Sequence, residues 1–250
     1  IRRLKKPPES ATRVSVLARA LVLGGAGFIA FHLVRKLATD GYEQITLVDD
    51  LSRGKLDPEL ELLLASHSTI SLITGDLTRR ETFDQFDGSY DRVYLMAGIV
   101  GVRNVQADPL RVLHTNTMIV LNTLDWLAST GCGRLLFAST SEAYSAPVDQ
   151  GVVPVPTSEE VPVGVMDPQE ARSTYALSKI WGESAVTHYA SAYSFEAVIV
   201  RYHNVYGPRM GFDHVIPELM ERALNEIDPF PVYGLEQTRA FCYVTDAVDA

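Results

Sequence analysis

Short runs of apolar residues alternate with longer segments of helical periodicity along most of the chain. Six apolar runs are typical of buried strands and lie at residues 19–24, 45–49, 70–74, 92–96, 134–138 and 197–201. Helical periodicity occupies residues 28–39, 110–129 and 174–193 between them. Because strands and helices alternate in this way, the sequence predicts an α/β fold with a doubly wound parallel sheet and helices on both faces.

The pattern changes toward both ends of the chain. A basic arm is predicted over residues 1–18, a sheet domain over 19–202 and a smaller lobe over 203–250. That lobe is predicted to hold a helix at 216–225, a short strand at 231–233 and a helix at 245–250. The last helix reaches neither a cap nor a helix breaker, so we expect the lobe to be incomplete.

Composition and charge narrow the class of protein. The 250 residues are 46% hydrophobic and 21% charged, which is typical of a water-soluble globular chain. Neither a run of eighteen apolar residues nor a secretory signal is present, so we expect a cytoplasmic protein that neither spans a membrane nor is exported. The net charge is −9; the first 20 residues hold six basic side chains and one acid, which leaves −14 on the rest. Such an acidic body argues against nucleic acid as a partner.

The basic arm and the cysteine and histidine spacing bear on partners and on metal binding. The basic arm is predicted to be a solvated tail, with contact to an acidic neighbour or a membrane surface as the alternative. The two cysteines and six histidines lack the spacing of metal ligands, so no metal site is predicted.

A glycine-rich segment, GGAGFIA at residues 24–30, joins the first predicted strand to the first predicted helix. Gly24 permits a turn that most side chains could not make, Gly27 lets a pyrophosphate approach the backbone, and Ala30 lets the helix pack on the sheet. The N–H groups at the start of the helix then face the phosphates. Asp49 follows Gly27 by 22 residues, near the spacing of an acid that holds an adenosine ribose. The segment therefore predicts a dinucleotide site, with a tight turn beside an incidental acid as the alternative.

The same acid bears on which dinucleotide is bound. A carboxylate at Asp49 would repel a 2′-phosphate and favours NAD over NADP, although Arg53 nearby could tolerate that phosphate. Two further segments end strands where a cofactor could lie: Asp76 with Leu77, and Met96 with Ala97 and Gly98. Ordinary turn chemistry is the alternative for both.

Tyr175 and Lys179 lie four residues apart in the motif STYALSK, so both side chains share one face of a predicted helix. Hydride transfer from a sugar alcohol needs a base, and a phenol with a pKa of about 10 is a poor base at neutral pH. Lys179 and a positive nicotinamide ring would both favour the phenolate of Tyr175. Thr140, at the carboxyl end of the fifth strand, would hydrogen-bond the same substrate oxygen; capping and turn chemistry is its alternative role.

Glu142 follows that threonine by two residues. Beside an oxidised sugar its carboxylate could remove a proton α to the new ketone, or steer the departure of a substrate carboxylate. The alternative is a surface acid or a partner for a backbone N–H.

Together these segments resemble the extended short-chain dehydrogenase/reductase family of NAD-dependent nucleotide-sugar epimerases, dehydratases and decarboxylases. GGAGFIA resembles the family's GGAGFIG, VDDLSRG at 48–54 resembles its second-strand motif, and YALSK at 175–179 resembles its YxxxK. RYHNVYGPRM at 201–210 and QTRAFCYVTDAV at 237–248 are similar to later motifs of its substrate lobe. The resemblance implies a Rossmann domain over 19–202, a substrate-binding lobe over 203–250, NAD as the cofactor, a nucleotide diphosphate sugar as the substrate, and a homodimer.

It also implies a set of site residues. Contacts to NAD are expected from Gly24, Gly27, Phe28, Ile29, Asp49, Asp50, Asp76, Leu77, Met96, Ala97, Gly98, Tyr175, Lys179 and Tyr202. Contacts to the substrate are expected from Ser141, Asn204, Arg209 and Arg239, with Asn204 and Arg239 at the phosphates. A turn former at Asn204 and solvated surface groups at the two arginines are the alternatives.

The residues after the fifth strand bear on the outcome of the reaction. The run TSEAY at residues 140–144 resembles the decarboxylases and dehydratases more than the simple 4-epimerases. Ser141 stands where the 4,6-dehydratases of dTDP-glucose usually have aspartate, which favours a UDP-glucuronate-type decarboxylase or a related dehydratase acting through a 4-keto intermediate. A 4-epimerase is the alternative. An alternative of another class is a non-catalytic NAD-binding sensor, against which the combination of Thr140, Tyr175 and Lys179 argues.

Overall fold

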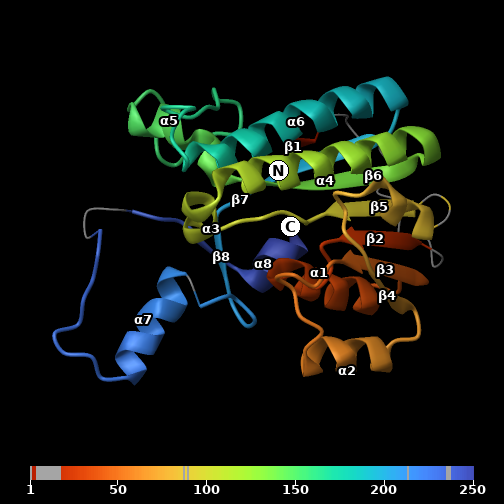
Figure 1. The fold of residues 1–250 in the computed structure, drawn as a ribbon, viewed down its shortest axis with the longest axis horizontal. Coiled ribbons are helices and arrows are strands. Elements are labelled where there is room, and N and C mark those ends of the chain that lie inside the picture. Colours follow the sequence, from red (N-terminus) through yellow and green to blue (C-terminus); the bar gives the residue numbers. More distant parts are fainter. Residues whose placement is uncertain (1, 4–17, 87, 89, 213, 235–237) are drawn as a thin grey trace.

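The computed structural model describes residues 2–3 and 18–250 apart from 87, 89, 213 and 235–237, and it is built around one large sheet (Figure 1). The sheet has seven strands in the order β1-β7-β6-β5-β2-β3-β4. All neighbouring strands pair in parallel except β1, which is antiparallel to β7. The strand order reverses direction at β2, as it does in doubly wound folds, and this confirms the predicted fold class.

The six predicted strands are all present. They are β2 (Arg19–Leu23), β3 (Gln44–Asp49), β4 (Ile70–Thr74), β5 (Tyr90–Leu95), β6 (Cys132–Thr140) and β7 (Glu196–Tyr202). Successive side chains of a strand point to opposite faces, so alternate residues of β2 enter different layers of the core. Leu21 and Leu23 pack on one side of the sheet, and Ala20 and Val22 pack on the other.

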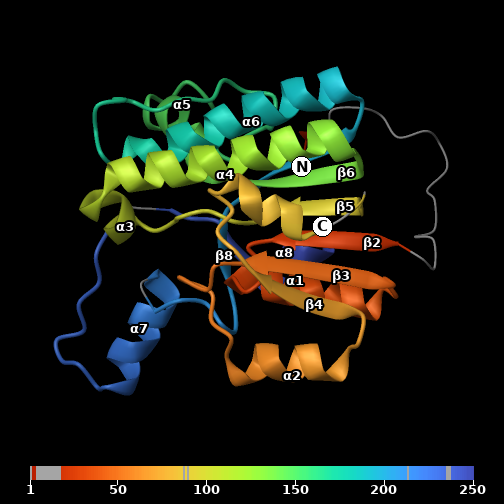
Figure 2. The same ribbon diagram turned by 45° about the vertical axis from the view of Figure 1, so that its right-hand side comes forward.

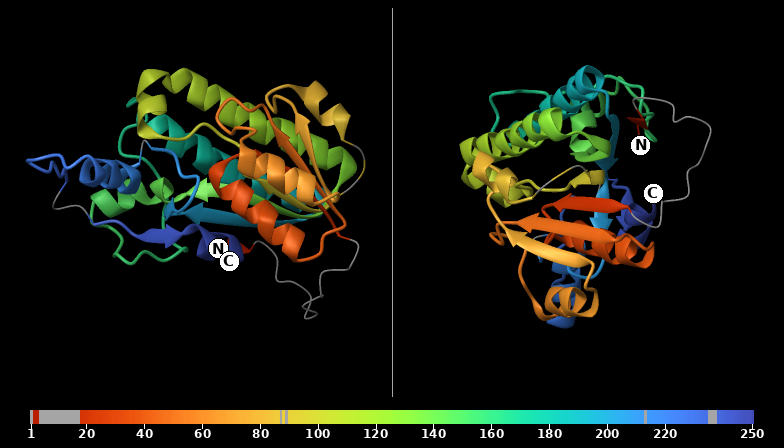
Figure 3. Two further views of the ribbon diagram at one scale, coloured as in Figure 1. Left: turned by 90° about the horizontal axis from the view of Figure 1, so that it is seen from below. Right: turned by 90° about the vertical axis from the view of Figure 1, so that its right-hand side faces the viewer.

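Helices cover both faces of the sheet (Figures 2 and 3). The first face carries α4 (Pro109–Thr130) and α6 (Ser173–Tyr193), which pack side by side against β6 and its neighbours. The second face carries α1 (Phe28–Thr39), α2 (Pro58–Ser66) and α8 (Val244–Asp249). The predicted bounds of α1 are confirmed to the residue, and those of α4 and α6 to within one residue.

Several short elements complete the sheet domain. Two of them, α3 (Val102–Ala107) and α5 (Ser145–Asp149), follow the carboxyl ends of β5 and β6, and two more, η1 (Arg80–Gln85) and η2 (Ser141–Tyr144), are short 3₁₀ helices. The helix α2 was not predicted, although it begins with a clear signal: the Asp57 carboxylate accepts a hydrogen bond from the Leu60 N–H at 3.0 Å, and Pro58 occupies the first helical position.

The predicted lobe over 203–250 is divided in the structure. A second sheet joins β8 (Asn204–Tyr206) to β9 (Phe241–Tyr243), and α7 (Val215–Leu224) contains no buried residue and stands away from the sheet domain in Figure 1. In contrast, α8 returns to α1, where the Lys36 ammonium lies 3.2 Å from the Asp249 carboxylate. The strand predicted at 231–233 was wrong: those residues form no strand, and the pairing is made by β9 instead.

The prediction of a free N-terminal tail was wrong for two of its residues. Arg2 and Arg3 form β1, which pairs with Ile199 and Val198 of β7 and so extends the sheet edge. Residue 1 and residues 4–17 of the arm lie outside the described residues. Within the part of the chain that is described, no helix is long and apolar enough to cross a membrane.

Candidate active site

The glycine-rich turn lies where β2 ends and α1 begins. Gly24 has a φ of +85°, and a Cβ on it would come within 2.7 Å of the Ala97 backbone. Only glycine combines that conformation with so close an approach. Gly27 caps α1 without a side-chain hydrogen bond, so the first N–H groups of the helix, including those of Phe28 and Ile29, point out of the turn. The turn therefore presents a backbone cradle and the positive end of a helix dipole.

The predicted ribose acid Asp49 and its neighbour Asp50, a further expected NAD contact, have different surroundings. Asp49 is buried, and its carboxylate accepts hydrogen bonds from the Ala26 N–H at 3.1 Å and the Leu51 N–H at 2.9 Å. Burial raises the pKa of Asp49, and these two backbone hydrogen bonds oppose the shift. Asp49 therefore holds the glycine-rich turn in place. Asp50 is exposed and accepts hydrogen bonds from the N–H and the hydroxyl of Ser52.

The remaining cofactor candidates divide between surface and core. Asp76 is exposed and accepts hydrogen bonds from the Thr78 N–H and hydroxyl, whereas the Leu77 side chain belongs to the core. Met96 and Ala97 are half-buried beside β2, and Gly98 follows them at the strand end. Phe28 and Ile29, at the start of α1, pack against a small apolar cluster that contains Val244. Tyr202, at the end of β7, packs against the same cluster. Tyr202 thus lies beside the cradle.

Thr140 and Tyr175 are brought together at the carboxyl end of β6. Burial raises the pKa of Tyr175 to about 12, while a hydrogen bond with Thr140 and the positive charge of Arg53 act in the opposite direction. The Thr140 hydroxyl also accepts a hydrogen bond from the Glu142 N–H at 3.2 Å and caps the turn η2. Thr140 thus has the capping role and lies beside Tyr175, while its hydrogen bond to a substrate oxygen stays a prediction.

Lys179 lies one helical turn after Tyr175 and is buried beneath the strand end. Its ammonium donates a hydrogen bond to the Ala138 carbonyl at 2.8 Å and lies 5.0 Å from the centre of the Phe137 ring. It also lies 3.5 Å from the position that a Cβ on Gly98 would occupy. Burial lowers the pKa of Lys179 to about 8. Lys179 thus reaches between the ends of β5 and β6, and no hydrogen bond joins it to Tyr175 in the described part of the chain.

Glu142 shares a pocket with Tyr175. The pocket is lined by Gly101, Val102, Val105, Glu142, Arg172 and Tyr175. Burial raises the pKa of Glu142, and the charges of Arg172 and Arg239 oppose the shift. Glu142 is half-buried and lines the pocket beside Tyr175, and its catalytic role stays a prediction.

The predicted substrate residues are not all in this pocket. Ser141 is half-buried next to Glu142, and the exposed Asn204 donates a hydrogen bond to the Ala240 carbonyl at 2.9 Å, next to Arg239. Arg209 is engaged elsewhere. Its guanidinium lies 2.6 Å from the Asp57 carboxylate and 3.8 Å from the centre of the Phe31 ring.

Sequence reasoning missed a buried amide beside Lys179. Asn116 of α4 accepts a hydrogen bond from the Ile99 N–H at 2.7 Å and donates to the Ile99 carbonyl at 3.1 Å and to the Ser178 hydroxyl at 3.2 Å. It thereby ties the segment after Gly98 to α6. An asparagine on the apolar face of a predicted helix was the available signal.

It also missed an ion pair behind the turn η2. Glu183 accepts hydrogen bonds from Arg201 and from the Ser139 hydroxyl, and Arg201 donates to the Tyr144 hydroxyl. The pair therefore links α6 and β7 to the residues on either side of Thr140. Among the described residues, no group of three histidine, cysteine, aspartate or glutamate side chains is arranged to hold a metal ion.

Comparison with known proteins places this geometry in a family. The profile of the NAD-dependent epimerase/dehydratase family matches residues 20–250. The chain belongs to this family. Among similar proteins are a UDP-N-acetyl-alpha-D-glucosaminuronate decarboxylase of Bacillus cytotoxicus, 33% identical over 93% of this chain and 69% of the relative, and UDP-glucuronic acid decarboxylase 1 of Xenopus tropicalis, 34% identical over 98% of this chain and 55% of the relative. A crystal structure of a UDP-galactose 4-epimerase superposes with a TM-score of 0.75 at 31% identity, over 92% of this chain and 69% of that one.

Membership of the NAD-dependent epimerase/dehydratase family confirms the predicted resemblance and NAD as the cofactor. The residues present fit that group: the cradle at Gly24, the open helix start after Gly27 and the acid pair Asp49–Asp50 lie together at the end of β2 and β3. The chain spans between 55% and 69% of the length of the two decarboxylases.

Proposed function

We propose that the protein modifies a nucleotide diphosphate sugar through a 4-keto intermediate, and that its outcome is decarboxylation of a UDP-uronate. The observation that carries this proposal is the placement of Glu142 in one pocket with Tyr175, whose phenol is close enough to the Thr140 side chain for that side chain to oppose the rise of its pKa. A base for the sugar hydroxyl and a second acid–base group are thus side by side. The similarity to two uronate decarboxylases supports the same outcome.

NAD held at the glycine-rich turn would supply a reversible acceptor for the hydride of sugar C4. The chain's own residues handle protons and position the sugar. Thr140 and Tyr175 converge on the C4 hydroxyl, and Tyr175 takes its proton. Because burial raises the pKa of this phenol to about 12, positive charge near it is needed at neutral pH, and Arg53 supplies part of that charge.

Glu142 acts after oxidation. A ketone at C4 makes a C6 carboxylate a β-keto acid, so the C5–C6 bond can break, CO₂ leaves and the electron pair passes to the C4 oxygen as an enolate. A proton must then be added at C5. The raised pKa of Glu142 lets its carboxyl group hold a proton to higher pH than an exposed glutamate, and it lies beside Tyr175 to deliver that proton.

A 4-epimerase is the second candidate, and the similarity to a UDP-galactose 4-epimerase favours it. That reaction would use Thr140 and Tyr175 in the same way and would leave Glu142 without a chemical step. A non-catalytic NAD sensor has no use for a phenol held by Thr140 in a pocket.

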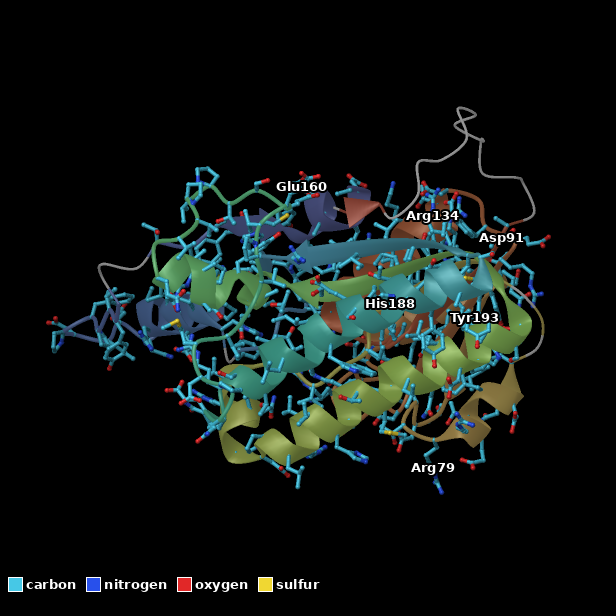
Figure 4. The ribbon with its side chains drawn as sticks, turned by 90° about the horizontal axis from the view of Figure 1, so that it is seen from above. Arg79, Asp91, Arg134, Glu160, His188 and Tyr193 are labelled. Carbon is cyan, nitrogen blue, oxygen red and sulfur yellow. The ribbon has the colours of Figure 1, made fainter. Side chains whose placement is uncertain are left out.

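We further propose that the protein is a homodimer joined through α4 and α6. These two long helices lie side by side on the outside of the sheet (Figure 4). They leave large apolar side chains exposed, namely Leu113 and Trp181, each 39% exposed, and Tyr193, 52% exposed. Two copies of this helix pair would bury those side chains against each other.

The first experiment follows products by NMR in deuterated water. Full-length protein and NAD⁺ are added in parallel to UDP-glucuronate, UDP-glucose, UDP-N-acetylglucosamine and dTDP-glucose. Carbon dioxide with a pentose product supports the proposal. A product inverted at C4 without deuterium at C5 would make the protein a 4-epimerase. Tyr175→Phe is the matched control: we expect it to bind NAD and to lose turnover, and unchanged turnover would refute the role of Tyr175.

A further inference from the structure

Three arginines from separate parts of the chain act on the two titratable groups of the pocket. Arg53 follows β3 and acts on Tyr175, whereas Arg172 precedes α6 and Arg239 precedes β9, and both act on Glu142. The chain outside its first 20 residues carries a net charge of −14. The three arginines therefore form a local concentration of positive charge on an otherwise acidic chain. It indicates a site for an anionic substrate.

Arg172 differs from the other arginines near the site because its guanidinium is available. Arg201 is bound to Glu183, and Arg209 is bound to Asp57. Arg172 lines the pocket with Glu142, yet within the described ranges no carboxylate lies within 4.0 Å of its guanidinium. Neither of these two groups is therefore paired with the other.

The position of Arg172 decides which part of a sugar nucleotide it would meet. Tyr175, three residues later, is the proposed partner of the C4 hydroxyl, so C4 of the sugar must lie in this pocket. In a pyranose ring C5 and its C6 substituent adjoin C4, whereas C1 and the diphosphate lie across the ring. C3 with its hydroxyl is the other neighbour of C4, and of these two ends only a C6 carboxylate carries the negative charge that matches a guanidinium.

We propose that Arg172 binds a carboxylate at C6 of the sugar and selects uronates over neutral sugars; this inference rests on the proposed function. A guanidinium is planar and presents paired N–H donors that match the two oxygens of a carboxylate. It also supplies the positive charge that a second carboxylate needs beside Glu142. The same contact would hold the C6 carboxylate next to Glu142 until the C5–C6 bond breaks.

The test measures binding, separately from turnover. UDP-glucuronate and UDP-glucose are titrated calorimetrically into the NAD-loaded protein and into its Arg172→Gln and Arg172→Lys variants. Arg79→Gln removes one exposed charge elsewhere on the molecule and is the matched control (Figure 4). Unchanged NAD affinity and thermal stability establish that the variants are folded.

We expect Arg172→Gln to raise the Kd for UDP-glucuronate about 10- to 100-fold, the range for loss of charged hydrogen bonds, and to change that for UDP-glucose less than about threefold. Arg172→Lys should restore part of the affinity, and Arg79→Gln should change neither. An equal loss for both ligands would overturn the inference alone and assign Arg172 to the diphosphate. A wild-type protein that binds neither ligand would overturn the proposed function itself.

Discussion

Removing one partner of the buried ion pair between Glu183 and Arg201 is expected to destabilise the fold more than removing one partner of a more exposed ion pair in the same sheet. Both side chains are about 10% exposed, and both oxygens of Glu183 accept hydrogen bonds from Arg201, at 2.8 and 2.5 Å. The Ser139 hydroxyl donates a third at 2.6 Å. Removing one partner of such a buried pair leaves an uncompensated charge and costs about 3–5 kcal/mol. In a chain of this length each kcal/mol lowers Tm by about 2–4 °C, so Glu183→Leu should lower it by about 6–20 °C.

The assay is thermal unfolding followed by circular dichroism, with a matched control on the neighbouring strands. Arg134 and Glu196 form an ion pair at 2.6 Å, but their side chains are 27% and 32% exposed. A pair of that exposure contributes about 1 kcal/mol or less, so Glu196→Leu should lower Tm by no more than about 4 °C.

A double variant separates the loss of the pair from the loss of packing. Replacing Glu183 with Leu and Arg201 with Met removes both charges, and apolar replacement of a whole buried pair is often neutral. The double variant should therefore be more stable than Glu183→Leu alone. If Glu183→Leu and Glu196→Leu cost the same, or if the double variant is the least stable, then the reasoning from burial is refuted.

Three further outcomes follow from single contacts. Gly182→Ala should lower the free energy of unfolding by about 1–3 kcal/mol in urea titrations, because its Cβ would lie 2.6 Å from the Phe137 ring, whereas Gly164→Ala, with open space around it, should change it by less than about 0.5 kcal/mol. Burial lowers the pKa of Lys179 to about 8 from 10.5, so between these values the unfolded chain holds a proton that the native protein lacks, and stability rises with pH. Relative to Lys179→Met, wild type should gain about 1.6 kcal/mol from pH 8 to 9.5; a difference that stays constant with pH would contradict this. Asp49→Ala should raise the Kd for NAD at least about tenfold by calorimetry, since the glycine-rich turn loses two hydrogen bonds to its carboxylate; unchanged affinity would show that the turn is held without it.

The strands and long helices were predictable because each is a local pattern. A parallel strand buried on both faces is a short apolar run, and α1, α4 and α6 are long enough for their periodicity to be read. The errors lie where pairing between distant segments decides the outcome. Residues 231–233 and 241–243 are equally short, and only the position of β8 determines that the second of them forms a strand. The same holds for Arg2 and Arg3, which form a strand only because the edge of β7 is open to them.

The site residues likewise divide into those that the sequence could place and those whose positions depend on distant segments. Thr140, Glu142 and Tyr175 could be brought together from the sequence, because the carboxyl ends of parallel strands meet at one edge. Arg209 could not be placed, since its partner Asp57 lies 152 residues away. Asn116 and Arg172 were missed because neither has a distinctive neighbour in the sequence, and their roles depend on which helix covers which strand end.

Burial and charge act against each other throughout this pocket. Burial raises the pKa of Tyr175 to about 12 and lowers that of Lys179 to about 8, so the closed environment alone would leave the phenol protonated and weaken the ammonium charge. Thr140 and Arg53 counter the first effect, and Arg172 and Arg239 oppose the same effect on Glu142. Because Arg53, Arg172 and Arg239 lie in loops that follow or precede strands and helices, whereas Thr140 ends β6, the rigid sheet supplies the burial and the loops supply the charge. Substitutions in the loops should therefore alter substrate choice and pH dependence while leaving the fold intact, whereas substitutions at the strand ends should alter both.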